Sequence, residues 1–332
     1  MSSSTTPVRP SVPARAVWIP LLVSLVCVLA GLGLVWGVRA ELPDPVARHW
    51  SADGTPDGFS SLRVQLAVAT LFPLLLSGIV LALGAGTRQL RALGPVAAGL
   101  AAFVSVVLFG STWAQRGQQA ATATDVNWPA WAGAGAGLLC GLLVWLTTRD
   151  TAHHVATATP AVDAPRIRVA PGTTLAWTGS TRASTGVWVS AVLGLLPMLV
   201  MGAVFWAMGN RSMGLFMLAL EVPMALLLSA LRCRVTIDAR GVRAMGLGLV
   251  PWVRLPLEQI EEATIGTASP MGDFGGWGYR GRLDGSGAWG LVTAEGEALV
   301  LERAGKGPLY VTVDRAREAA GVVNTLISRS AR

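Results

Sequence analysis

The sequence predicts an α-helical integral membrane protein of about six spans that carries a C-terminal α+β domain. Of its 332 residues, 52% are hydrophobic and only 14% are charged, whereas soluble domains have about a quarter charged residues. Six apolar runs are long enough, or nearly so, to cross a hydrocarbon layer of about 30 Å. After residue 231 the helical period gives way to the alternation that is typical of strands.

The apolar runs divide the chain into segments. They lie at residues 17–38, 64–84, 94–112, 129–147, 187–208 and 213–231. We expect a disordered tail at 1–16, a four-span domain at 17–148 with an external loop at 39–63, a cytoplasmic linker and strand-like segment at 149–186, a two-span hairpin at 187–231 and a soluble domain at 232–332. The tail is rich in Ser, Pro and Thr, a composition that cannot bury a core.

Arginine placement predicts the orientation. Arginines are more numerous on the side of the N-terminus, although the loop at 39–63 is itself fairly basic. The positive-inside rule therefore predicts a multi-pass cell-membrane protein with both termini in the cytoplasm. The net charge of +7 is spread beside apolar runs. This indicates the lipid bilayer as a partner and not nucleic acid.

The external loop holds the most distinctive polar residues, the binding candidates Asp44, His49, Asp53 and Asp57. Three prolines stiffen it, and two Asp-Gly pairs form turns. Imidazole and carboxylate groups can bind a cation, yet the register of a calcium loop is absent. The alternative is that the aspartates cap turns and that His49 bonds locally. We expect no metal and no cofactor.

Glu221 is the other candidate, near the middle of the sixth run. An ionisable group in hydrocarbon costs about 2.5–3.5 kcal/mol and is a functional candidate for that reason. The alternatives are a shallow hairpin or a protonated carboxyl that pairs within the bundle. In the fourth run, Gly133, Gly137 and Gly141 recur on one helical face, which predicts close approach of a neighbouring helix.

The soluble part should contain about seven short strands and one C-terminal helix. The helix begins after Asp314 and has an apolar face. Two G-x-G-x-x-G matches follow residue 275, but neither opens a helix, so we interpret them as loops. The interaction loop at 275–282 is a further candidate, because its residues Trp277, Tyr279, Arg280 and Arg282 are of interface type. His153 and His154 should be solvated linker residues.

The chain has three histidines, and no nucleophilic or metal-protease motif is present. The preferred function is non-enzymatic: a membrane protein that couples the external loop to a cytoplasmic interaction domain. The alternatives are a transporter or channel subunit, which needs polar residues inside the bundle, and a membrane enzyme with an unidentified site.

Two segments resemble known families. Leu42-Pro43, Pro45-Val46, His49-Trp50, Gly54 and the run from Pro56 to Ser60 lie between the first two spans. This pattern resembles a bacterial membrane domain of unknown function that begins the SdpI-like immunity proteins, over about residues 17–85 and with an extension to 148 left open. The resemblance implies a role in immunity or signalling.

The second resemblance lies further along the chain. PGTTLAWTGS, a two-span hairpin and VTIDARGV look like bacterial membrane-anchored pleckstrin-homology-like domains. This implies another membrane or cytoplasmic protein as a partner for residues 232–332. SdpI-like proteins do not typically carry such a module, so the immunity role does not transfer directly.

Overall fold

The computed structural model describes residues 14–118, 127–149, 155–156, 159–170, 172–181 and 183–330. Most of the tail expected at 1–16, and both linker histidines, lie outside these residues. The chain divides into two compact units. One comprises the described residues of 12–150 and 196–221, and the other comprises the described residues of 151–195 and 222–332.

The described residues contain six helices that are long and apolar enough to cross a membrane. They are α1 (Arg15–Gly37), α2 (Leu62–Gly86), α3 (Leu90–Trp113), α4 (Asn127–Thr148), α5 (Thr185–Ala207) and α6 (Arg211–Leu228). A short 3-10 turn, η2 (Ser229–Leu231), extends α6. Each helix coincides with one predicted run, so the multi-pass prediction is confirmed.

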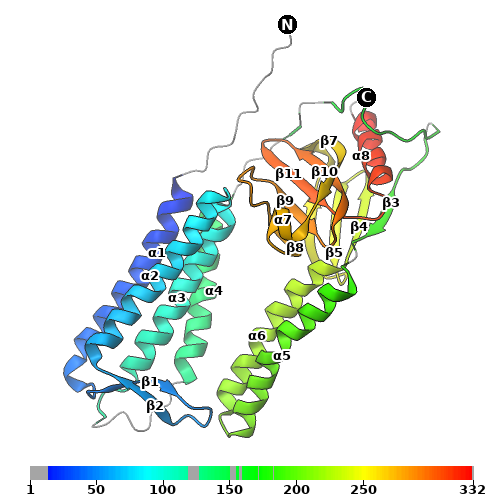
Figure 1. The fold of residues 1–332 in the computed structure, drawn as a ribbon. Coiled ribbons are helices and arrows are strands. Elements are labelled where there is room, and N and C mark those ends of the chain that lie inside the picture. Colours follow the sequence, from blue (N-terminus) through cyan, green and yellow to red (C-terminus); the bar gives the residue numbers. More distant parts are fainter. Residues whose placement is uncertain are drawn as a thin grey trace. The chain divides into compact units, whose positions relative to one another are not determined.

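Helices α1 to α4 lie side by side in a bundle (Figure 1). The predicted glycine face of α4 packs on α3: a Cβ added at Gly137 would lie 2.8 Å from the carbonyl oxygen of Gly99. Polar side chains inside the bundle bond to one another, as Ser24 of α1 does with Ser77 of α2, with 2.9 Å between the hydroxyl oxygens. Small residues and internal hydrogen bonds are the usual means of holding helices together in lipid.

The loop between α1 and α2 is folded. After the 3-10 turn η1 (Arg39–Glu41), strands β1 (Val46–Trp50) and β2 (Pro56–Ser60) form an antiparallel hairpin. Figure 1 shows this hairpin across one end of the α1–α4 bundle. The prolines and turn formers of the loop therefore build a small sheet at one membrane face.

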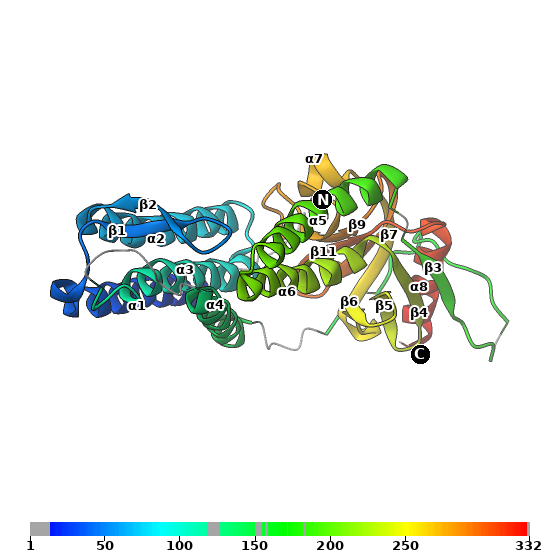
Figure 2. The ribbon, with the colours of Figure 1, turned by 90° about the horizontal axis from the view of Figure 1, so that it is seen from below.

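Helices α5 and α6 run side by side as a hairpin (Figures 1 and 2), with Gly214 close to the carbonyl oxygen of Gly202. The hairpin is inserted between two paired strands, β3 (Trp177–Ser180) before it and β4 (Cys233–Asp238) after it. The sheet-rich domain therefore begins upstream of the hairpin, within the segment that the sequence predicted as a linker and a strand-like stretch.

The domain contains two sheets. The first has the order β3-β4-β5-β6, with β5 (Gly241–Gly246) and β6 (Val250–Leu255), and all its pairs are antiparallel. The second has the order β7-β10-β11-β9-β8. Its strands are β7 (Ile260–Ala268), β8 (Gly278–Gly281), β9 (Trp289–Val292), β10 (Gly296–Arg303) and β11 (Lys306–Val311), and only β9 and β11 pair in parallel.

One core joins both sheets to α8 (Ala316–Ser330), the final helix that the sequence predicted. Its apolar residues include Ile237, Leu299, Leu301 and Val323, all fully buried. The region is sheet-rich with a terminal helix, as expected. The segment 275–282 was predicted as a loop, but its residues Gly278–Gly281 form strand β8. The short helix α7 (Pro270–Phe274) ends just before this segment begins.

Candidate functional site

The β1–β2 hairpin is fastened to the bundle on one side. Val46 and Ala47 are fully buried. The side chain of Gln115, just after α3, accepts the N–H of Ala47 and donates to its carbonyl oxygen, both at 2.8 Å. The amide group thus completes the hydrogen bonds that a neighbouring strand would supply. Sequence reasoning missed Gln115, since nothing near it signals this pairing.

Asp53 shapes the turn between the two strands. Its carboxylate accepts the hydroxyls of Ser51 and Thr55, at 2.5 and 2.6 Å, and the N–H of Thr55 at 2.9 Å. Gly54 follows with φ at +89°, a conformation that suits glycine. The Ser51 and Thr55 hydrogen bonds favour the charged form and lower the pKa of Asp53 to about 2. The turn-capping interpretation therefore describes Asp53.

The outward side of the hairpin carries a paired histidine and aspartate. The Nδ1–H of His49 donates to Oδ1 of Asp57 at 2.5 Å, and the two side chains are 71% and 47% exposed. Gly58 lies opposite His49, where a Cβ would come 2.9 Å from the histidine Cβ. The carboxylate orients the imidazole ring, and Nε2 is the ring nitrogen that remains for a ligand.

The remaining loop aspartate stands apart from this pair. Asp44 is exposed and precedes the cis peptide bond to Pro45. Across the described residues, no group of three or more His, Cys, Asp or Glu side chains is placed to hold a metal ion. The structure thus joins two of the four predicted loop residues, His49 and Asp57, and uses a third to build the turn.

A polar cavity of about 400 Å³ adjoins the turn of the hairpin. Asp53 and Gly54 form one side, and Arg211 and its neighbours in the α5–α6 turn form another. The full lining is Asp53, Gly54, Asn127, Gly209, Asn210, Arg211 and Ser212. Three chain segments far apart in the sequence therefore contribute to one polar surface, which includes the Asp53–Gly54 turn but neither His49 nor Asp57.

Glu221 lies in α6 and is half-buried. Both carboxylate oxygens are shielded from solvent, and neither has a hydrogen-bond partner among the described residues. The structure does not bring Glu221 together with the loop residues. It stays a separate candidate, because an ionisable group in this position is costly to retain.

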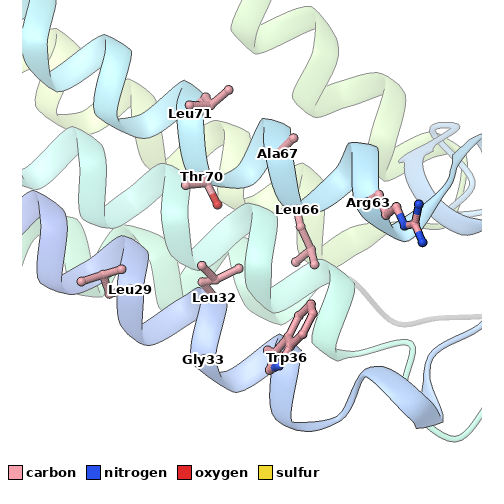
Figure 3. A pocket seen from close by; sticks show the side chains of 9 residues that line it. All are labelled: Leu29, Leu32, Gly33, Trp36, Arg63, Leu66, Ala67, Thr70 and Leu71. Carbon is pink, nitrogen blue, oxygen red and sulfur yellow. The ribbon is translucent and has the colours of Figure 1, made fainter.

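An apolar groove of about 790 Å³ runs between α1 and α2 (Figure 3). Leu29 and Leu71 lie at one end, and Trp36 and Arg63 lie toward the other, where the hairpin begins. Its walls are the outward sides of two spans, so lipid acyl chains fill it in a bilayer. We interpret it as a lipid contact.

Most of the interaction-loop residues have structural partners. Tyr279 of β8 stacks on Trp289, with ring centroids 5.1 Å apart. Arg282 binds Asp273 and the hydroxyl of Tyr310 at 3.1 and 2.9 Å. Trp277 is half-buried, whereas Arg280 is exposed. Of the four, Arg280 is the residue best placed to meet a partner.

Neither models of known families, nor curated proteins, nor solved structures match this chain. Its function is therefore argued from the geometry of its own residues, and the two resemblances stand as sequence-level proposals.

Proposed function

We propose that this chain is a non-enzymatic bacterial cell-membrane protein that recognises a ligand outside the cell and presents an interaction domain in the cytoplasm. The observation that carries the proposal is the division of strand β1 into a buried start and an exposed continuation. Gln115, Val46 and Ala47 fasten the start to the bundle, while His49 further along the strand pairs with Asp57 at the surface. A rigid scaffold with exposed polar groups is a common design for recognition.

The topology supports two separate faces. With six spans, the β1–β2 hairpin follows an odd number of crossings and the β4–α8 region follows an even number. The arginine bias places the second face in the cytoplasm. The sheets and final helix are compatible with a pleckstrin-homology-like fold, and we propose another membrane or cytoplasmic protein as the partner of residues 232–332.

The resemblance of the first spans and their loop to SdpI-like proteins supports a role in immunity or signalling. The rival transporter role gains little from the interior of the bundle. Four of its buried polar side chains are paired in helix contacts: Gln65 donates to Thr112 at 3.2 Å, and Ser24 bonds to Ser77. These contacts fit a packed scaffold.

The test separates folding from recognition. Cells that lack the chain are challenged with secreted antibacterial peptides and complemented with wild type, His49→Ala, Asp57→Asn or the control Arg48→Ala, whose side chain is also exposed. A polar pair this exposed contributes about 0–1 kcal/mol even when both partners are charged, so all variants should accumulate normally. We expect protection from wild type and Arg48→Ala only.

A structural role gives a different pattern. If His49→Ala accumulates poorly while Arg48→Ala does not, the pair belongs to the fold. If His49→Ala and Asp57→Asn protect cells as well as wild type does, the recognition proposal is wrong.

A further inference from the structure

The turn that joins β5 and β6 exposes two leucines. Leu247 is 65% exposed and Leu249 is 78% exposed. The turn is closed by the N–H of Leu249, which donates to the carbonyl oxygen of Gly246 at 3.0 Å. Leu247 has φ at +51° and Gly248 at +73°. Asn and Gly are the usual residues in such a turn, and a leucine there is unusual.

The position of this turn in the sheet explains why leucines would be kept. β4 begins two residues after η2, the end of the span Arg211–Leu231. β5 runs back along β4, so that Gly246 pairs with Cys233. The turn after Gly246 therefore lies at the edge of the domain where α6 leaves the hydrocarbon.

Contacts fix the turn to the end of the span. The indole N–H of Trp252 in β6 donates to the Ser229 hydroxyl at 2.9 Å. A Cβ at Gly246 would lie 2.6 Å from the carbonyl oxygen of Ser229, so the backbone of β5 packs directly against the backbone of η2. The turn cannot move far from the membrane surface while α6 spans the bilayer.

Charge completes this surface. Arg232 and Arg234, the residues on either side of Cys233, are both exposed. Arg234 pairs in register with Met245, next to the turn. Basic side chains beside exposed leucines suit the boundary between lipid headgroups and acyl chains.

We propose that the Gly246–Leu249 turn is an interfacial membrane anchor of the soluble domain. Leu247 and Leu249 enter the headgroup–acyl boundary of the leaflet where α6 ends, and Arg232 and Arg234 bind lipid phosphates beside them. The bilayer, which already surrounds α6, is the occupant, so the anchor acts within one molecule and orients the domain against the membrane. The leucines supply most of the attraction, so high salt leaves it largely intact.

The anchor is tested on the full chain in phosphatidylglycerol-containing nanodiscs. Cys27, Cys140 and Cys233 are replaced by Ser, and a fluorophore is attached at Leu249→Cys or, as a matched control, at Ala239→Cys. Ala239 is exposed in the β4–β5 turn, at the opposite end of the same strands. Iodide serves as the aqueous quencher and brominated lipid as the membrane quencher.

We expect the label at 249 to be quenched several-fold more by brominated lipid, and several-fold less by iodide, than the label at 239. The same iodide quenching at both sites would overturn the proposal. Protection of position 249 from both quenchers would also overturn it and would indicate a protein partner instead.

A second variant guards against misfolding of the labelled protein. Leu247→Asn with Leu249→Ser retains all native cysteines and places Asn where φ is positive, which its side chain tolerates. In nanodiscs, we expect residues 246–250 of this variant to exchange hydrogen faster than those of the wild type, while the core strand β10 stays protected in both. Unchanged exchange at the turn would contradict the anchor.

Discussion

The contact between Gly99 of α3 and Gly137 of α4 allows a sharp test of the membrane unit. A Cβ at Gly137 would lie 2.8 Å from the Gly99 carbonyl oxygen and 3.2 Å from the Cβ of Phe103. The nearer atom belongs to backbone and cannot rotate away. Gly135, two residues earlier on the same helix, is exposed, and a Cβ there meets nothing within 4 Å.

This pair of sites isolates the packing energy. Alanine at either position gains helix propensity of about 1 kcal/mol over glycine. Only Gly137→Ala adds overpacking, which costs about 1–3 kcal/mol. We therefore expect Gly137→Ala to be about 1–3 kcal/mol less stable than Gly135→Ala.

The assay is the thermal unfolding midpoint of the purified full chain in one detergent, followed by tryptophan fluorescence. For about 2–4 °C per kcal/mol in a unit of this size, Gly137→Ala should melt about 2–12 °C below Gly135→Ala. Gly99→Ala should behave like Gly137→Ala. The double variant should lose less than the sum, because one helix separation relieves both clashes. Equal midpoints for Gly135→Ala and Gly137→Ala would refute the close approach.

Two further predictions concern other contacts. The Sγ atoms of Cys27 in α1 and Cys140 in α4 are 4.0 Å apart, so mild oxidation in membranes should join them by a disulfide of about 2.05 Å. Both cysteines should then resist alkylation after denaturation, whereas in Cys140→Ser the two remaining thiols should react. Two reactive thiols at Cys27 and Cys140 after oxidation would contradict the α1–α4 contact. Asn324→Leu should destabilise the sheet-rich domain by about 1–3 kcal/mol for each buried group left unpaired. Hydrogen exchange of β7 measures the loss, with the exposed Arg317→Ala as a neutral control. Protection of β7 like that of wild type in Asn324→Leu would contradict the prediction.

The spans could be predicted closely because lipid imposes a simple rule on the sequence. A helix must remain apolar for the thickness of the hydrocarbon, and each of the six runs meets that rule locally. The glycine face of α4 was predictable for the same reason, since Gly133, Gly137 and Gly141 recur at helical spacing. The final helix was predictable from its apolar face and from Asp314, which precedes its start.

Long-range pairings could not be predicted in this way. Gln115 follows the third span with no local pattern to connect it to Ala47, 68 residues earlier. β3 has visible strand signals, yet its partner β4 lies beyond two membrane helices. The polar cavity is missed for the same reason, because its lining comes from three separate segments. At the loop, the sequence identified His49 and Asp57 but not that they bond to each other.

The insertion of α5–α6 between β3 and β4 determines how the sheet-rich domain should be studied. Residues 232–332 alone would lack β3 and leave the edge of β4 unpaired, and exposed strand edges promote association. They would also lose the segment before β3 that packs on α8: Asn324 holds the N–H and carbonyl of Ala263 at 2.8 and 2.7 Å, and it also donates to the carbonyl of Pro165 at 3.0 Å. A partner captured by that fragment could be bound to the edge of β4, which is exposed only because β3 is missing. The sheet-rich domain is thus complete only when the residues on both sides of the α5–α6 hairpin are present, because β3 precedes the hairpin and β4 follows it.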